Sequence, residues 1–260
     1  MDRREFLSRA AAMTLVGGGS ALALAQAMLP RYAKAQTISF TDKRMTARYV
    51  EYDSPGGNSG RMRGYLVKPV GDGPFPAVLV IHENRGLNPH IEDVARRAAI
   101  DGFLALAPDG LAPAGGYPGD DDDGKQLQRS LDRGKLHVDF FNSARFLKSH
   151  ALSNGKLGTT GFCWGGGTVN YLAVEMGGDL HAAVPFYGAA AEPGIDRIKA
   201  PLLVQYAEND GRINAMRSGF EAGLKAAGAK FEMHTYPGTK HGFHNNSTPR
   251  YNADQAKLAW

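Results

Sequence analysis

The single cysteine of this 260-residue chain, Cys163, has the sequence neighbours that a nucleophile needs. It stands in Gly161-Phe162-Cys163-Trp164-Gly165, where an apolar run gives way to a helical pattern. This is the G-x-S-x-G strand-to-helix turn with cysteine in the serine position. The turn calls for glycine on both sides because the positions two before and two after the nucleophile crowd each other. A thiol here lies at a helix N-terminus, which favours the thiolate, and the backbone N–H of Trp164 would point at an oxyanion.

A buried, inert cysteine in a glycine-rich turn would give the same local pattern, so partner residues must decide between the two readings. A thiol nucleophile works with a base that an acid orients. Asp210 follows a later apolar run, and His241 lies beyond the last β-rich run. We predict that His241 takes the thiol proton and that Asp210 orients its ring. Glu208 and His244 are the neighbouring rivals for these two roles.

The elements that must position these residues are short apolar runs that alternate with helical stretches. Continuous apolar runs suit strands that are covered on both faces. Regular alternation of strand and helix predicts an α/β fold with a mostly parallel, doubly wound sheet. The expected strands are 77–81, 103–107, 157–162, 182–186, 202–206 and 231–236, and the expected helices are 89–101, 125–150, 165–177, 214–227 and 250–259.

Two β-rich segments, 46–53 and 63–70, precede this alternation. A turn cluster rich in glycine and serine separates them, so they predict an antiparallel hairpin at a sheet edge. The acidic run Asp120–Asp123 is expected to be a solvated loop. His82 is expected to orient a loop, and the remaining histidines lack metal-ligand spacing.

The first 35 residues are similar to a twin-arginine export signal. Two adjacent arginines precede a weakly apolar stretch, and a small-x-small cleavage pattern ends at Ala35. We therefore expect residues 1–35 to be a signal peptide, 36–260 to be one domain, and the protein to be periplasmic or secreted. No stable membrane span would remain after cleavage, although a membrane-anchoring helix is the alternative interpretation.

The basic charge of the chain belongs largely to this signal. Removing residues 1–35 takes away five basic and two acidic residues, which lowers the net charge from +4 to +1. We therefore expect no nucleic-acid or anionic-membrane partner. The partner is expected to be a small-molecule substrate, and the protein is expected to be a monomer. One cysteine cannot form an internal disulfide, so the thiol is either buried or reactive.

From about Thr46 to Trp260 the chain resembles the dienelactone hydrolase (carboxymethylenebutenolidase-like) family of α/β-hydrolases. The segments that carry the resemblance are Ile81-His82-Glu83-Asn84-Arg85-Gly86-Leu87, Ser153-Asn154-Gly155-Lys156 with the cysteine turn, Glu208-Asn209-Asp210 and His241-Gly242-Phe243.

The resemblance implies a Cys163-His241-Asp210 triad with Glu83 beside the thiol, where this carboxylate helps to form the thiolate. It also implies that the backbone N–H of Asn84 completes the oxyanion hole. The implied reaction is hydrolysis of a small lactone or ester through an acyl-thioester, with no metal or organic cofactor.

The chain departs from the family at the residues that bind the substrate. The family member that acts on dienelactones holds the substrate carboxylate with arginines, one of them shortly after the histidine, whereas here no arginine follows His241 until Arg250. Dienelactone is therefore not assigned as the substrate, and Arg129 and Phe243 are the candidate substrate contacts. Two alternatives stay open: a non-catalytic binding or redox-sensing protein, and a serine-hydrolase-like scaffold in which Cys163 is accidental.

Overall fold

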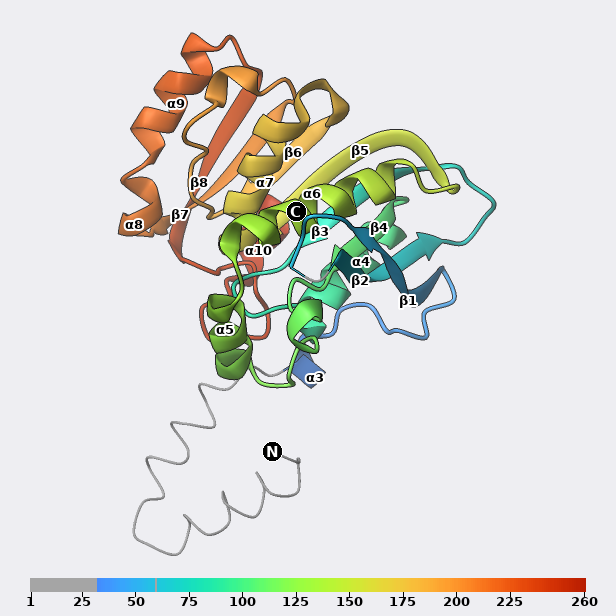
Figure 1. Ribbon diagram of the computed structural model, residues 1–260. Helices are drawn as coiled ribbons and strands as arrows, with labels where there is room; N and C mark the ends of the chain where they lie inside the picture. Colours follow the sequence, from blue (N-terminus) through green and yellow to red (C-terminus); the bar gives the residue numbers. More distant parts are fainter. Residues whose placement is uncertain (1–31, 59) are drawn as a thin grey trace, which may run out of the picture.

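The computed structural model describes residues 32–58 and 60–260, so most of the predicted signal peptide lies outside the described residues. Eight strands form one sheet in the order β1-β2-β4-β3-β5-β6-β7-β8 (Figure 1). All pairs from β4 to β8 are parallel, as predicted. The strands are β1 (Met45–Ser54), β2 (Gly60–Pro69), β3 (Phe75–Ile81), β4 (Leu104–Pro108), β5 (Ser153–Phe162), β6 (Ala182–Phe186), β7 (Leu202–Asn209) and β8 (Phe231–Lys240).

The predicted hairpin is present at one edge of the sheet. β1 pairs antiparallel with β2 from Met45 opposite Pro69 to Ser54 opposite Gly60, and β2 pairs antiparallel with β4. The prediction of an α/β fold with a mostly parallel sheet and an N-terminal antiparallel hairpin is therefore confirmed.

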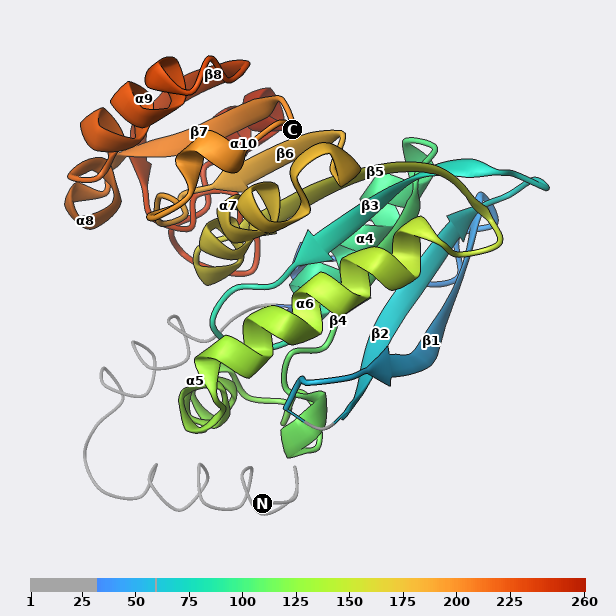
Figure 2. The same ribbon diagram turned by 45° about the horizontal axis from the view of Figure 1, so that its top comes forward.

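Helices cover both faces of the sheet (Figure 2). A separate apolar core lies between the sheet and each helix layer. α4 and α10 pack on one face, and α6, α7 and α9 pack on the other. Strands buried in this way need apolar residues on both faces, which explains the continuous apolar runs. The helices are α3 (Tyr32–Ala35), α4 (Pro89–Ile100), α5 (Asp121–Ser130), α6 (Arg133–Lys148), α7 (Trp164–Met176), α8 (Gly211–Asn214), α9 (Arg217–Ala226) and α10 (Ala253–Ala259), with short 3₁₀ turns at Ala112–Ala114, Gly177–Asp179 and Ile195–Arg197.

The predicted helix 125–150 was wrong in one respect, since two helices occupy this stretch. α5 ends at Ser130, and the backbone of the next residue, Leu131, is extended. α6 then starts anew, with the side chain of Asp132 accepting a hydrogen bond from the backbone N–H of Lys135. An N-cap of this kind competes with continuation of the preceding helix. The predicted helix 214–227 corresponds to α9, and its first residue, Asn214, is the last residue of α8.

The acidic run at Asp120–Asp123 is not the solvated loop that we predicted. Asp120 caps α5 by accepting hydrogen bonds from the backbone N–H groups of Asp122 and Asp123, and the acidic residues fill the first turn of the helix. Negative charge is favoured there by the helix dipole. Asp121 is buried and accepts a hydrogen bond from the Tyr117 hydroxyl at 2.9 Å.

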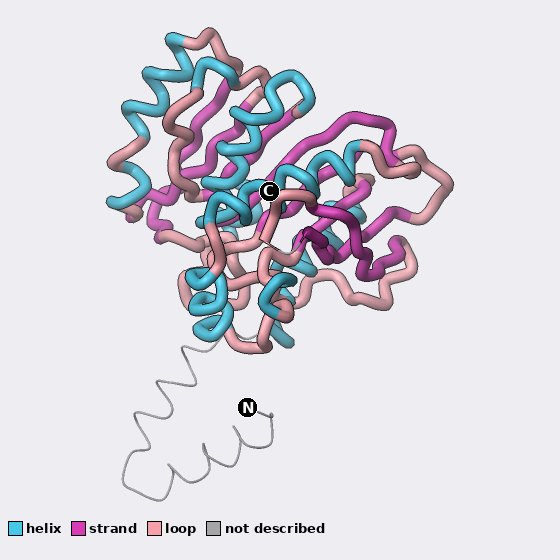
Figure 3. The backbone as a smooth tube through the Cα atoms, viewed as in Figure 1, coloured by secondary structure: helices cyan, strands magenta, loops and turns pink. Residues whose placement is uncertain are grey.

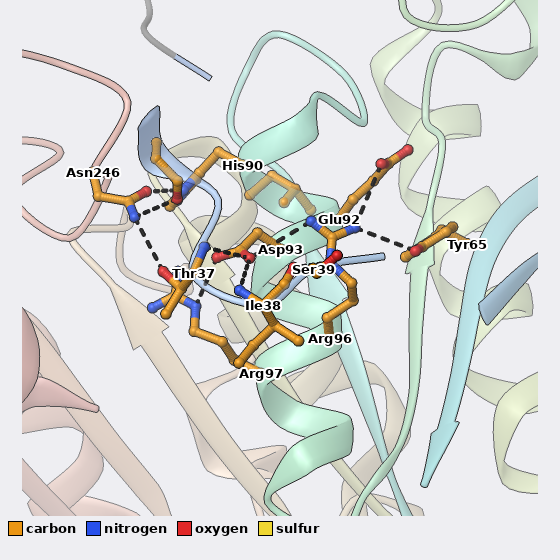
Figure 4. A network of polar contacts seen from close by, with 12 residues as sticks. Thr37, Ile38, Ser39, Tyr65, His90, Glu92, Asp93, Arg96, Arg97 and Asn246 are labelled. Carbon is orange, nitrogen blue, oxygen red and sulfur yellow. Dashed lines mark hydrogen bonds and ion pairs between the residues drawn. The ribbon is translucent and has the colours of Figure 1, made fainter. Parts of the chain in front are cut away.

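The chain just before β1 is bound to α4 by a buried carboxylate (Figure 4). Asp93 accepts hydrogen bonds from the backbone N–H groups of Thr37 and Ile38 at 2.9 and 2.8 Å. The guanidinium of Arg96 donates to the Ile38 carbonyl at 2.8 Å and lies 3.6 Å from Asp93. Asn246 donates to the Ala35 carbonyl at 2.6 Å. Segment 35–38 is therefore joined to both α4 and the loop after β8.

Among residues 32–58 and 60–260, none of the helices combines the length and the apolar character that crossing a bilayer requires.

Candidate active site

The candidate residues stand in the loops and turns that follow the parallel strands, and Figure 3 draws these loops and turns in pink between magenta strands and cyan helices. Cys163 stands between β5 and α7 with φ 57° and ψ −114°, a conformation that a non-glycine residue rarely adopts. A methyl group placed on Gly161 would lie 2.5 Å from the carbonyl oxygen of Gly165, and one on Gly165 would lie 2.4 Å from that of His82. The predicted need for glycine at both positions is confirmed.

His241 and Asp210 meet across the sheet edge. Asp210 directly follows β7, and His241 directly follows β8, which runs parallel to β7. Nδ1 of His241 donates to Oδ2 of Asp210 at 2.5 Å. The other carboxylate oxygen of Asp210 accepts a hydrogen bond from the backbone N–H of Ile213, so Asp210 also caps the N-terminus of α8. The imidazole orientation is therefore fixed by a carboxylate that is itself held in place.

The protonated form of His241 is stabilised by its neighbours. Burial alone lowers the pKa of His241, but hydrogen bonds to Asp210 and Cys163, together with their negative charges, raise this pKa to about 9. Burial raises the pKa of Asp210, yet the hydrogen bond and charge of His241 outweigh it and leave the pKa below its ordinary value. A neighbouring carboxylate that accepts a hydrogen bond from an imidazole favours the protonated imidazolium.

The two rival residues lie elsewhere. Glu208 is exposed and accepts a hydrogen bond from the backbone N–H of Gly238. His244 is fully buried, with its ring stacked on Phe162 at 4.9 Å between centroids. Burial, with the charges of Arg97 and a second histidine, holds the pKa of His244 well below its ordinary value. Neither residue takes part in the pair between His241 and Asp210.

Glu83 follows β3 and is buried beside these groups. Its carboxylate accepts a hydrogen bond from the amide nitrogen of Asn245 at 2.9 Å. The amide oxygen of Asn245 accepts from the backbone N–H and the hydroxyl of Ser247, which fixes the amide nitrogen toward Glu83. Burial raises the pKa of Glu83, although Asn245, Arg250 and His241 act to lower it. A buried carboxylate with a raised pKa is a stronger base than an exposed one.

Two residues near this centre were missed from the sequence. Arg250 folds back so that a methyl group on Gly242 would lie 3.3 Å from its guanidinium carbon. The ring of Tyr187 lies 5.0 Å from that of His241, and burial raises the Tyr187 pKa, with further contributions from the neighbouring Glu83 and Cys163. An aromatic residue directly after β6, at the same sheet edge as Asp210, was the available signal for Tyr187.

His82 supports the loop that carries Glu83, as predicted. Its Nε2 accepts from the backbone N–H of Gly110 at 3.0 Å, so Nδ1 carries the proton and donates to the carbonyl of Glu83. Burial lowers the pKa of His82 to about 4, which keeps the ring neutral. The ring also stacks against Trp164, at 5.7 Å between centroids.

A cavity of about 530 Å³ opens beside the thiol. Asn84, Cys163 and Trp164 line it together, which brings both predicted oxyanion-hole residues to the candidate nucleophile. The two predicted substrate contacts do not line it: Arg129 is an exposed residue at the end of α5, and Phe243 is fully buried in the core. Among the described residues, no group of three or more His, Cys, Asp or Glu side chains is placed to hold a metal ion.

The chain is similar to known proteins over most of its length. A sequence model described as the dienelactone hydrolase family matches residues 62–260. A "Putative carboxymethylenebutenolidase" of Escherichia coli is 33% identical over 248 residues, covering 87% of this chain and 88% of that protein. A "Putative hydrolase fragment" of the same organism is 57% identical over 114 residues, which are 44% of this chain and 97% of the fragment.

Solved structures share the same fold. A crystal structure described as a putative dienelactone hydrolase from Klebsiella pneumoniae has a TM-score of 0.70 and 28% identity, covering 83% of this chain and 95% of that one. A dienelactone hydrolase-like promiscuous phosphotriesterase from metagenomic libraries has a TM-score of 0.71 and 25% identity, covering 84% and 95%.

Proposed function

Since the chain belongs to the dienelactone hydrolase family and is an ester or lactone hydrolase, we propose that it works through Cys163 as a covalent nucleophile. The observation that carries this proposal is the 2.5 Å hydrogen bond between His241 and Asp210, with Cys163 as the second group that raises the His241 pKa. A solvated loop histidine would need no such carboxylate partner.

The first step is formation of a thiolate. His241 takes the proton of Cys163 and becomes an imidazolium, which the adjacent Asp210 stabilises. The N-terminus of α7 favours negative charge on the sulfur. The buried Glu83 assists as a further base near the thiol, since its pKa is raised.

Acylation follows when the sulfur attacks the carbonyl carbon of an ester or lactone. The C–S bond forms as the carbonyl π electrons move onto oxygen, and the backbone N–H groups of Trp164 and Asn84 stabilise this oxyanion. The carbonyl then re-forms, the C–O bond breaks, and the imidazolium of His241 protonates the leaving oxygen. An acyl-thioester on Cys163 and a neutral imidazole remain.

Deacylation reverses these roles. His241 takes a proton from water, the resulting hydroxide attacks the thioester carbonyl, and the same N–H groups hold the second oxyanion. Collapse releases the carboxylic acid and the Cys163 thiolate, and the imidazolium pairs with that thiolate again. No step needs an oxidant or a reductant.

Trapping the acyl-enzyme tests this mechanism. The protein is mixed with p-nitrophenyl acetate and quenched in acid during turnover, and the peptide that contains Cys163 is expected to carry one hydroxylamine-labile acetyl group. An acetyl group on another residue, or none during steady turnover, would contradict the proposal. A redox-sensing protein would instead react with iodoacetamide at Cys163 and hydrolyse no ester.

The pH dependence follows from the His241 pKa. We expect kcat/KM to fall at alkaline pH with an apparent pKa near 9, because the imidazolium that pairs with the thiolate is lost as pH rises through that value. Asp210→Asn removes the stabilising charge, so the alkaline limb should move to lower pH. The measurement is hydrolysis of p-nitrophenyl acetate from about pH 6 to 10, corrected for spontaneous hydrolysis. An identical alkaline limb in both proteins would contradict this assignment.

A further inference from the structure

A buried ring, that of His82, lies between the two backbone segments that are expected to form the oxyanion hole. His82 directly follows β3 and is fully buried. One segment is the loop with Glu83 and Asn84, and the other is the start of α7 at Trp164. A side chain in this place can set the orientation of both segments.

The hydrogen bonds of His82 fix its ring from two sides. Nε2 accepts a hydrogen bond from the backbone N–H of Gly110, which follows β4, at 3.0 Å. Because an N–H can only donate, Nδ1 carries the ring proton and donates to the carbonyl oxygen of Glu83 at 2.5 Å. A methyl group on Gly110 would lie 2.7 Å from Nε2, so this close contact needs glycine. The ring therefore connects the loop after β3 to the chain after the neighbouring strand β4.

The carbonyl that accepts the Nδ1 proton belongs to the same peptide group as the backbone N–H of Asn84. A peptide group is planar, and in the trans form its C=O and N–H point in opposite directions. The bond between Glu83 and Asn84 is trans. His82 holds the carbonyl on its own side and so directs the Asn84 N–H to the other side, and Asn84 lines the cavity beside Cys163.

The backbone N–H of Asn84 is available for an oxyanion. Within residues 32–58 and 60–260, no carbonyl or side chain accepts a hydrogen bond from it. The Trp164 N–H likewise has no acceptor in this part of the chain, because it stands at the first position of α7, where helical N–H groups lack a partner within the helix. Two such donors beside one thiol are what a tetrahedral oxyanion requires.

The His82 ring also packs against the second donor segment. It stacks on the Trp164 indole, with 5.7 Å between centroids and 22° between planes. The carbonyl oxygen of His82 lies against the same turn, since a methyl group on Gly165 would be 2.4 Å from it. Phe140 of α6 packs edge-on against both rings, with 5.4 Å between centroids in each pair. One packed unit therefore holds both donors.

We propose that His82 is the positioning residue of the oxyanion hole: it holds the peptide group between Glu83 and Asn84 so that the Asn84 N–H meets the developing negative charge. The inference rests on the proposed function, because this charge develops only when Cys163 attacks a carbonyl. A donor on the carbonyl side also polarises the peptide group, which makes its N–H a stronger donor. Without the His82 bond the peptide is free to rotate and to turn its N–H away from the cavity.

Two variants that are similar in shape separate the two hydrogen bonds of His82. In His82→Asn the amide nitrogen takes the place of Nδ1 and still donates to Glu83, but the bond from Gly110 is lost. In His82→Gln the amide oxygen takes the place of Nε2 and still accepts from Gly110, but no donor remains at the Nδ1 position. For p-nitrophenyl acetate we expect His82→Gln to lower kcat by about 10²-fold, as for the loss of one oxyanion-hole donor, and His82→Asn to stay within about tenfold of wild type.

Reaction of Cys163 with 4,4′-dithiodipyridine shows whether the rest of the site is intact. This disulfide reacts with the thiolate and forms no oxyanion, so its rate should stay within about twofold of wild type in both variants. The matched control is His90→Gln, since His90 is also buried and its Nδ1 is bonded to Asn246 instead of to the oxyanion loop. The control should keep the wild-type rate in both assays.

A measurement on the unsubstituted protein covers variants that do not fold. Trifluoroacetone adds to the Cys163 thiolate as a hemithioketal, and the oxygen that was its carbonyl becomes an oxyanion at the hole. Negative charge on the N–H side of the peptide strengthens the hydrogen bond on the carbonyl side. The Nδ1 proton resonance of His82 should therefore move to lower field when the adduct forms, as followed by NMR.

The outcomes separate this inference from the proposed function. A large loss in His82→Gln, recovery in His82→Asn and the shift of the Nδ1 proton support the positioning role. Wild-type hydrolysis in His82→Gln, an equal loss in both variants, or an Nδ1 proton that the adduct does not move would refute it, while the acetyl group on Cys163 would still support the mechanism. If wild type forms no such acetyl adduct, the proposed function itself fails.

Discussion

Cys163→Ala is expected to lower kcat for activated esters by roughly 10⁴-fold or more, the largest effect of any single substitution in this chain. In the proposed mechanism the sulfur is the atom that bonds to the acyl group, so the variant has no atom that could form the thioester. The oxyanion-hole N–H groups of Trp164 and Asn84 would survive and leave a small residual rate. Steady-state hydrolysis of p-nitrophenyl acetate, with purified protein, measures the loss.

The same variant has a second readout that a merely structural cysteine would not affect. Because Cys163 helps to raise the pKa of His241, its removal should lower that pKa from about 9, as followed by NMR titration of the imidazole. Thermal unfolding should change little, since alanine fills almost the same space. Full activity in Cys163→Ala, with an unshifted His241, would rule out the thiol as nucleophile.

Asp93→Ala is expected to lower the free energy of unfolding by about 3–5 kcal/mol, the range for removing one partner of a buried ion pair. The Asp93 side chain is 1% exposed, as is that of Arg96, and Nε of the adjacent Arg97 lies 3.1 Å from the carboxylate. Without Asp93 these cations lose their counter-charge, and the backbone N–H groups of Thr37 and Ile38 lose their acceptor. Urea denaturation of the full chain measures the change.

Two further variants show whether charge or hydrogen bonding accounts for this loss. Asp93→Asn keeps an acceptor for the two N–H groups but removes the charge, so it should be intermediate between wild type and Asp93→Ala. Glu221→Ala removes the partly exposed partner of the exposed Lys225 and should leave the midpoint nearly unchanged. If Asp93→Ala denatures at the same urea concentration as Glu221→Ala, segment 35–38 does not contribute to stability as we expect.

The strand pattern was predictable because burial on both faces of a parallel sheet forces continuous apolar runs, as in Leu104–Pro108, where every residue is buried. Helix ends were less predictable. The break between α5 and α6 depends on Asp132 acting as an N-cap inside a stretch with helical periodicity. N-capping also decided the structure of the acidic run. Asp120 caps α5, although an acidic run by itself indicates a solvated loop.

Residues close to Cys163 in sequence could be assigned from the sequence alone, because the turn geometry is local. The glycines at 161 and 165 are needed by contacts within that turn and with the end of β3. Chain order and strand ends were likewise enough to choose Asp210 and His241, since parallel strands β7 and β8 bring their carboxyl ends to one edge.

The sequence by itself thus determined the α/β sheet, the family, and the candidate nucleophile with its predicted partners. Only the tertiary structure decided which loop side chains come together: Asn245 with Glu83, Arg250 against Gly242, and Tyr187 over His241. It also showed that residues of α7 line the cavity beside Cys163, whereas Arg129 and Phe243 do not. The physical reason is the sequence distance over which each effect acts. Periodicity and turn chemistry act over a few residues, whereas these contacts join segments that lie far apart in sequence and that only the packing of the whole sheet brings together.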